Sequence, residues 1–283
     1  MADASSATRT SPRRRTSAGA WVVRAIVAVY LFLLVLWPTA VLFRGAFADG
    51  LGTITAAIAD PDVVHALVLT GQTAVLAVAI NLVFGLGVSL LLVRYDFFGK
   101  RVLSWLIDLP LSASPVVVGL ALLLVYSPVY GWFGPGLREA GIEVAFAMPG
   151  IVMATCFVSL PLVVREVVPV LTELGDDQEQ AARSLGAGGW QTFRRITLPG
   201  IRWALVYGLV LSLARSLGEF GAVKVVSGHV IGQTATATVA VESAYQNNNT
   251  EQAYAIAVLL VLATVLCLVV VAILHTRDAR EKG

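Results

Sequence analysis

Charged residues are scarce in this sequence. Asp, Glu, Lys and Arg make up 13% of the 283 residues, whereas soluble domains carry about 25%. Hydrophobic residues instead account for 57%, and the mean hydropathy is +0.81. The formal net charge of +2 is too small to indicate a nucleic-acid partner. This composition excludes an ordinary soluble domain and indicates a membrane protein.

Metal-ligating and disulfide-forming residues are equally rare. The two cysteines, Cys156 and Cys267, both fall inside apolar runs, which is typical of buried thiols. The three histidines, His65, His229 and His275, lie far apart along the chain without ligand spacing. A disulfide framework and a zinc site are therefore not expected.

The motifs of nucleotide hydrolysis and of common hydrolases are missing. Gly99 and Lys100 are adjacent, but Arg94 stands where a phosphate-binding loop requires glycine. The sequence also contains neither GxSxG nor HExxH. The chain is therefore not expected to hydrolyse ATP, and a membrane enzyme would lack a recognisable catalytic constellation.

Long apolar runs dominate what is present. A membrane-spanning helix needs roughly 20 mostly apolar residues. Six segments meet or approach this length, at about 24–43, 65–93, 109–126, 145–164, 201–218 and 253–274. The first exceeds a signal-peptide core and is interpreted as a transmembrane helix. Residues 102–110 are expected to form an interfacial elbow before the third. The predicted fold is an all-α integral membrane protein with six transmembrane helices.

The distribution of positive charge predicts the orientation. Of the 20 Lys and Arg residues, all but four lie near the termini or within 94–101 and 165–202. The exceptions are Arg44, Arg138, Lys224 and the intramembrane Arg215. Because cytoplasmic loops carry the excess of positive charge, both termini and the loops 94–101 and 165–200 are predicted to be cytoplasmic. The loops 44–64, 127–144 and 219–252 are predicted to face outward.

Two further segments lie outside the predicted spans. Residues 1–20 are rich in Ser, Thr, Ala and Arg and are expected to form a disordered cytoplasmic tail. Residues 21–283 would then form one six-span domain. The outward loop 219–252 begins with residues too apolar for a plain solvent loop. It is expected to fold back and line a cavity, where irregular backbone is tolerated.

A polar segment at 175–199 interrupts the apolar runs on the cytoplasmic side. Its pattern predicts a short helix over 178–185, with acidic residues at its N-terminal end. Glu179 and Arg183 stand four residues apart and are expected to pair on the exposed face. Gly186 is placed to end this helix. Pro199 lies near the start of the next span, where proline is tolerated.

The spacing in this segment resembles the EAA motif of ABC-importer permeases, which reads Ala-Ala, three residues, Gly, nine residues, then Ile-x-Leu-Pro. The matching residues are Ala181, Ala182, Gly186, Ile196, Leu198 and Pro199. The first position, usually Glu, is Gln180 here, and Glu179 precedes it. The resemblance implies that these eight residues couple the membrane helices to a cleft in an ATP-hydrolysing subunit.

A second stretch resembles sulfate/thiosulfate permease subunits of the CysW type. Residues 213–228 read LARSLGEFGAVKVVSG, and Gly-Gln-Thr follows at 232–234. Permeases for molybdate and tungstate share Gly-Glu-Phe-Gly, so this element alone does not select sulfate. The continuation Ala-Val-x-Val-Val-Ser-Gly favours the sulfate branch. Molybdate or tungstate remains the alternative substrate.

This second stretch also holds the candidate residues for a translocation path or gate. They are Arg215, Gly218, Glu219, Gly221 and Lys224. Ionisable residues at membrane depth usually face a bundle interior or a cavity. Arg215 and Glu219 are four residues apart, so mutual pairing is the alternative to a direct role. Lys224 could attract a divalent anion electrostatically.

The resemblance implies the type I ABC-importer permease (MetI-like) fold in a prokaryotic cell membrane. It also implies a second homologous permease subunit, two ATPase subunits and an extracytoplasmic sulfate-binding protein. A heterodimer of permeases is favoured over a homodimer. ATP and magnesium would be bound by the ATPase, and this chain would hold no cofactor. An ion-gradient-driven transporter with Glu219 as a proton site is the competing hypothesis from another class.

Overall fold

The computed structural model describes residues 18–48 and 50–281. The expected N-terminal tail therefore lies mostly outside the described residues. The chain divides into two compact units, one ending at Gly45 and one beginning at Ala46. The described residues form helices throughout and contain no strand.

The first unit is one apolar helical stretch. It consists of α1 (Ala18–Leu31), the π-helical segment η1 (Phe32–Leu36) and α2 (Trp37–Ala46), which ends at the unit boundary. Its large hydrophobic side chains, from Trp21 to Val41, are exposed in the isolated chain. This surface requires an apolar environment such as lipid.

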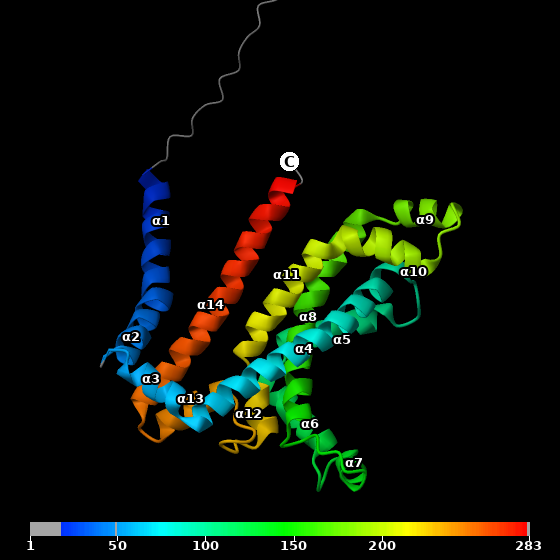
Figure 1. Cartoon of the computed structure of the whole chain (residues 1–283). Coiled ribbons are helices and arrows are strands. Elements are labelled where there is room, and N and C mark those ends of the chain that lie inside the picture. Colours follow the sequence, from blue (N-terminus) through cyan, green and yellow to red (C-terminus); the bar gives the residue numbers. More distant parts are fainter. Residues whose placement is uncertain (1–17, 49, 282–283) are drawn as a thin grey trace, which may run out of the picture. The chain divides into compact units, whose positions relative to one another are not determined.

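The second unit is a bundle of long helices with short helices at both ends (Figure 1). The long helices are α4 (Pro61–Arg94), α8 (Met148–Leu174), α11 (Leu198–Leu217) and α14 (Thr250–Glu281). A bent pair joins them, α5 (Lys100–Ser112) and α6 (Pro115–Tyr126). The short elements are α3 (Gly52–Ala59), α7 (Gly134–Glu139), α9 (Asp177–Ser184), α10 (Gly189–Thr192), η2 (Phe193–Thr197), α12 (Gly221–Ser227) and α13 (Ala237–Gln246).

The helices extend beyond most of the predicted spans. Within the described part of the chain, five helices are long and apolar enough to cross a membrane. A sixth span results if α5 and α6, which are bent by 115°, are counted together. Pro115 begins α6, and the residue before a proline is disfavoured in the helical region, which explains the break. The fifth span is longer than predicted, because helical structure runs without a break from Gly189 to Leu217.

The core of the second unit is formed where α8 packs between α4 and α11. Val163, Val167 and Leu171 of α8 are buried against Ile201 and Leu205 of α11. Leucines of α4 pack against the same cluster. Small residues allow the backbones to approach closely, as is common between membrane helices.

Two glycines show how close this approach is. A Cβ atom added to Gly85 of α4 would lie 2.9 Å from Cγ1 of Val163. One added to Gly208 of α11 would lie 2.9 Å from the Cα atom of the same valine. Val163 is therefore held between glycines of two neighbouring helices.

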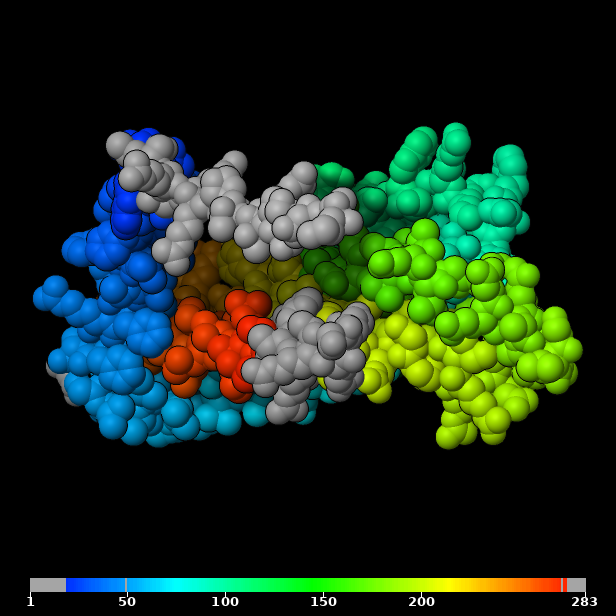
Figure 2. Space-filling model, turned by 90° about the horizontal axis from the view of Figure 1, so that it is seen from above, coloured from blue at the N-terminus to red at the C-terminus, as the bar shows by residue number. Residues whose placement is uncertain are grey.

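Figure 1 places the two groups of candidate residues at opposite ends of this bundle. The helices α9 and α10 lie at one end, together with the last turns of α14, and α12 and α13 lie at the other. Figure 2, which looks down on the first end, shows that the segment around residues 170–195 projects to one side of α14. The polar segment 175–199 is thus a protrusion from the bundle.

Candidate functional site

The polar segment forms a hairpin of short helices between α8 and α11. The helix α9 covers Asp177–Ser184, one residue earlier at each end than the predicted 178–185. After a turn, α10 and η2 lead directly into α11. The hairpin is therefore joined covalently to two of the three core helices.

Gly186 ends α9 in the left-handed conformation, with φ of +87°. The Gly186 amide donates to the carbonyl of Arg183 at 2.9 Å, and the Ala187 amide donates to the carbonyl of Ala182 at 3.0 Å. This pair of bonds is a Schellman motif, which satisfies the last carbonyls of a helix. Glycine adopts this φ without the steric cost that a Cβ atom would add.

The outer face of the hairpin combines small and large apolar residues. Ala181 and Gly186 are exposed, and no atom lies within 4 Å of a Cβ added to Gly186. Leu185 is 90% exposed and Trp190 is 72% exposed. The sequence did not single out Leu185, although this large apolar residue directly follows the polar helix α9. Exposed apolar groups around a small-residue surface are typical of a protein-docking face.

The last residues of the motif turn away from this face. Ile196 and Leu198 are partly buried, and Leu198 packs against the core cluster of α8 and α11. Pro199 is exposed and lies in the first turn of α11, as the sequence predicts. Ala182 is partly buried, whereas Ala181 is exposed. The motif therefore includes both exposed residues of the hairpin and the residues at the start of α11, where the hairpin joins the bundle.

Glu179 does not lie on the exposed face, and that prediction is wrong. Glu179 as a whole is only 4% exposed, because its side chain points into the bundle. Its main partner is Arg94, at 3.0 Å between Nη2 and Oε1, while Arg183 lies 3.8 Å away. The hydroxyl of Thr197 donates to the same carboxylate at 2.8 Å. Residues 94 and 179 are far apart in the sequence, so the spacing of residues within the segment could not predict this contact.

Gln180 is exposed at the motif's first position. The buried carboxylate is supplied by Glu179, its neighbour. The departure from the usual Glu therefore changes the outward-facing side chain and leaves the internal ion pair intact.

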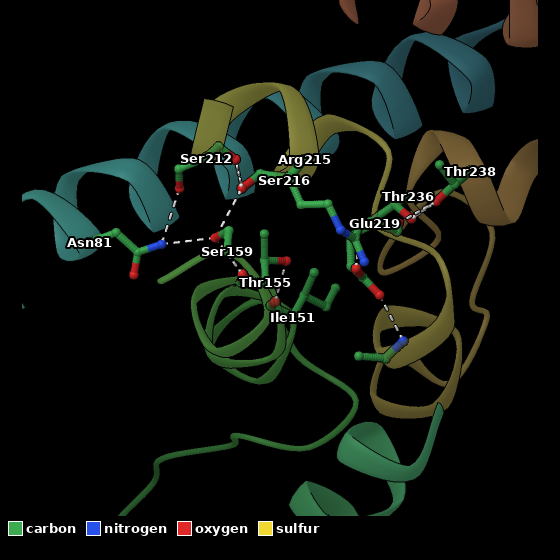
Figure 3. Close-up of polar contacts among 11 residues, drawn as sticks. Asn81, Ile151, Thr155, Ser159, Ser212, Arg215, Ser216, Glu219, Thr236 and Thr238 are labelled. Atoms are coloured by element: carbon green, nitrogen blue, oxygen red, sulfur yellow. Dashed lines mark hydrogen bonds and ion pairs between the residues drawn. The ribbon is translucent and has the colours of Figure 1, made fainter. Parts of the chain in front are cut away.

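At the opposite end of the bundle, Arg215 pairs with Glu219, at 2.7 Å between Nη1 and Oε2 (Figure 3). The Glu219 side chain is 2% exposed, whereas that of Arg215 is 37% exposed. Oε1 of Glu219 accepts from the Ala222 amide at 2.9 Å, and its carbonyl accepts from Thr238 at 2.8 Å. Glu219 thus fixes the turn between α11 and α12, and Arg215 neutralises it.

Lys224 is also paired. Its ammonium group contacts the carboxylate of Glu242 on α13. Both residues line a cavity of about 300 Å³, which His229 and Gln246 also border. The expected cavity in loop 219–252 is therefore present, and its charged lining combines a cation with an acid. The pairing partner Glu242 was not identified from the sequence.

The two glycines of this region have different surroundings. Gly218 follows the last residue of α11, and nothing closer than 4.0 Å meets an added Cβ. Gly221 begins α12, and an added Cβ would lie 3.0 Å from Cβ of Pro115 on α6. The helix breaks between Leu217, where α11 ends, and Gly221, and the missing side chain of Gly221 permits close packing of α12 on α6.

A buried polar network lies beside the Arg215–Glu219 pair (Figure 3). The Asn81 amide of α4 donates to Ser159 of α8 at 2.8 Å and to Ser212 of α11 at 3.2 Å. Ser216 lies 3.4 Å from Ser159 and donates to the Ser212 carbonyl at 2.7 Å. The network ties together the three core helices. The sequence signal was weak, a single Asn inside an apolar run.

The comparisons with known proteins agree on one family. Residues 81–280 match the family described as binding-protein-dependent transport system inner membrane component. The chain is 50% identical to Sulfate permease 2, chloroplastic, of Chlamydomonas reinhardtii, covering 85% of this chain and 66% of that protein. It is 43% identical to the sulfate transport system permease protein CysW of Escherichia coli K12, covering 93% and 91%. It is 40% identical to CysT of the same organism, covering 79% and 80%.

Among solved structures, a bacterial alginate ABC transporter in complex with a periplasmic protein bound to alginate pentasaccharide has a similar chain. The TM-score is 0.73 over 92% of this chain and 95% of that one, at 17% sequence identity. At this identity the likeness concerns the fold.

Proposed function

This chain belongs to the family of binding-protein-dependent transport system inner membrane components, and from this premise we propose that it is the transmembrane permease subunit of an ATP-driven sulfate importer. It is a permease component and not itself the ATPase. Sulfate is favoured because relatives named for sulfate transport are 43% to 50% identical to this chain over most of its length.

The observation that carries the coupling role is the docking face of the α9–α10 hairpin. It exposes Leu185 and Trp190 beside the small residues Ala181 and Gly186. The partner that fits this face is an ATPase subunit on the cytoplasmic side. A cleft in that subunit would take up α9, since small side chains permit close approach.

The mechanism follows from the position of this hairpin between two core helices. Closure of the ATPase dimer on ATP would move α9, and α8 and α11 would transmit the motion through the bundle. The bundle would then open outward, and hydrolysis with product release would reset it. ATP and magnesium act only in the partner, and this chain makes no covalent bond.

The candidate residues at the other end of the bundle would form part of the translocation path or its gate. Arg215, Gly218, Glu219, Gly221 and Lys224 lie at the end of the bundle opposite the hairpin. From Thr197 to Arg215 a helix rises about 27 Å, which is close to the thickness of a bilayer core. Both cations are paired with acids in this structure. An arriving divalent anion would compete with Glu242 for Lys224.

The complex we propose contains a second, CysT-like permease, two ATPase subunits and an extracytoplasmic sulfate-binding protein. The similarity of this chain to both CysW and CysT of one organism supports a heterodimer of homologous permeases. The complex would lie in the cell membrane of a prokaryote, with both termini of this chain in the cytoplasm.

Reconstitution tests this function directly. The complete complex is placed in proteoliposomes with ATP inside, and uptake of labelled sulfate is measured with and without the binding protein. Uptake should require both ATP and the binding protein and should persist with an uncoupler. Stronger competition by molybdate than by thiosulfate would move the substrate to the molybdate branch. Uptake without ATP that an uncoupler abolishes would support an ion-gradient transporter instead.

A further inference from the structure

Arg94, the last residue of α4, contacts three other segments of the chain. Its Nε lies 3.2 Å from both carboxylate oxygens of Glu179 on α9, and its Nη2 lies 3.0 Å from Oε1. Its Nη1 donates to the Leu171 carbonyl of α8 at 3.2 Å, and its Nη2 donates to the Gly175 carbonyl at 2.7 Å. All five donor hydrogens of a guanidinium lie in one plane, so one rigid group links α4, α8 and α9.

This cluster, formed by Arg94, Glu179, Gly175, Leu171 and Thr197, is shielded from water. The side chains of Arg94 and Glu179 are 13% and 6% exposed. Charge-assisted bidentate pairs of this kind are stronger and more directional than neutral hydrogen bonds. Removing one partner leaves the other charge buried and uncompensated. These contacts of Arg94 form a tie between α4, α8 and α9. Breaking this tie costs free energy, and the tie therefore fixes the orientation of α9.

Gly175 provides the matching backbone geometry. Its φ of 65° and ψ of −168° lie in a region that is essentially restricted to glycine. This conformation turns the chain from α8 into α9 and presents the Gly175 carbonyl to Arg94. The turn is the covalent link between the hairpin and α8, and without a tie it would allow α9 to pivot.

Thr197 closes the cluster from the other side of the hairpin. It lies in η2, and its residue is 3% exposed. A π-helical turn carries one more residue than an α-helical turn and is often found at functional sites. The Glu179 carboxylate thereby receives donors from α4 and from the segment that enters α11.

We propose that Arg94 is the positioning residue that transmits motion of α9 to α4, the one core helix that has no direct chain connection to the hairpin. The inference rests on the proposed function, because it concerns the route by which ATPase closure reaches the bundle. With the tie intact, α4, α8 and α11 move with α9 as one unit. Without it, α9 pivots on Gly175, and α4 no longer follows.

The test compares transport with ATP hydrolysis in the reconstituted complex. The double variant Arg94→Gln/Glu179→Gln removes both charges, so that neither residue is left as an unpaired buried charge. Arg94→Lys keeps the charge but cannot reach the carboxylate and both carbonyls. Both variants should still bind the ATPase, and sulfate transported per ATP hydrolysed should fall about tenfold in the double variant. The loss should be smaller for Arg94→Lys.

Arg165→Gln is the matched control, because it breaks an exposed pair between α8 and Asp108 of α5. It should leave the transport-to-hydrolysis ratio unchanged. Spin labels on α4 and α9 provide a second readout, in a background without Cys156 and Cys267. ATP should move both helices in the wild-type complex, whereas in Arg94→Lys the movement of α4 should be reduced relative to that of α9.

Wild-type transport ratios and wild-type movement of α4 in Arg94→Lys would overturn the proposal, even if the double variant failed to assemble. A wild-type complex that imports no sulfate would instead contradict the proposed function.

Discussion

The carboxylate of Glu179 can be buried because hydrogen-bond donors surround it. Arg94, Thr197 and, at longer range, Arg183 converge on it from separate segments. The residue beside it, Gln180, faces outward. Two neighbouring residues of α9 therefore have different roles. The side chain of Glu179 holds helices together, and that of Gln180 is accessible to a partner.

A first prediction at the residue scale concerns Gly186. Gly186→Leu places a side chain at φ of +87° and inserts bulk into the docking face. Left-handed backbone costs about 1–2 kcal/mol for a residue with a Cβ. We expect the variant permease to reach the membrane but to lose the ATPase on copurification, or to hydrolyse ATP without importing sulfate.

Gly188→Leu is the control for this prediction. A Cβ added to Gly188 also meets open space, but its φ of −69° is ordinary. The docking role of Gly186 is contradicted if Gly186→Leu assembles and transports like wild type.

A second prediction concerns the paired cations at the outer end. Lys224→Gln removes the cation that faces the cavity, and Arg215→Gln leaves Glu219 buried without a counter-charge. An unpaired buried group costs about 1–3 kcal/mol, and more if it is charged. Sulfate uptake should fall in both variants, while thermal stability should fall mainly in Arg215→Gln. Unchanged uptake and unchanged sulfate-stimulated ATP hydrolysis in both would remove these residues from the path.

At the scale of the elements, glycine positions set how closely the core helices pack. Gly208 of α11 faces the backbone of Val163, so Gly208→Ala forces the two helices apart. Overpacking of this kind costs about 1–3 kcal/mol, and we expect a lower melting temperature in detergent. Gly87→Ala on α4, where an added Cβ meets nothing within 4 Å, is the control and should be neutral. Equal melting temperatures for the two variants would show that this contact does not limit packing.

The elements also show how far the sequence alone could predict the fold. Hydropathy located the long helices, because a span requires a run of apolar residues. Glycine located the end of α9. Residues 102–110, expected as an elbow before the third span, instead lie within α5, and the bend follows at residues 113–114. The inward orientation of Glu179 and the partner of Lys224 could not be found this way, because Arg94 and Glu242 reach these residues only after the helices pack.

At the scale of the whole molecule, the two candidate regions lie at opposite ends of the second unit (Figure 1). The interior between them contains the Arg94 cluster, the glycine contacts at Val163 and the network of Asn81 and Ser159. Asn81→Leu removes the donor to Ser159 and Ser212. We expect Asn81→Leu to retain ATPase binding, because the hairpin is distant, and to import sulfate more slowly. Wild-type uptake by this variant would exclude the network from the moving parts.

The central claim is that the α9–α10 hairpin is the surface through which an ATPase drives this permease. The most direct measurement is site-specific cross-linking of the assembled complex in proteoliposomes. Leu185→Cys or Trp190→Cys is the only thiol of this chain, and a thiol-to-amine reagent containing a reducible disulfide forms the cross-link. Each should cross-link to the ATPase subunit, and the cross-linked complex should stop importing sulfate until the cross-link is reduced. Cross-links to the binding protein or to no partner, with sulfate import unaffected, would contradict the account.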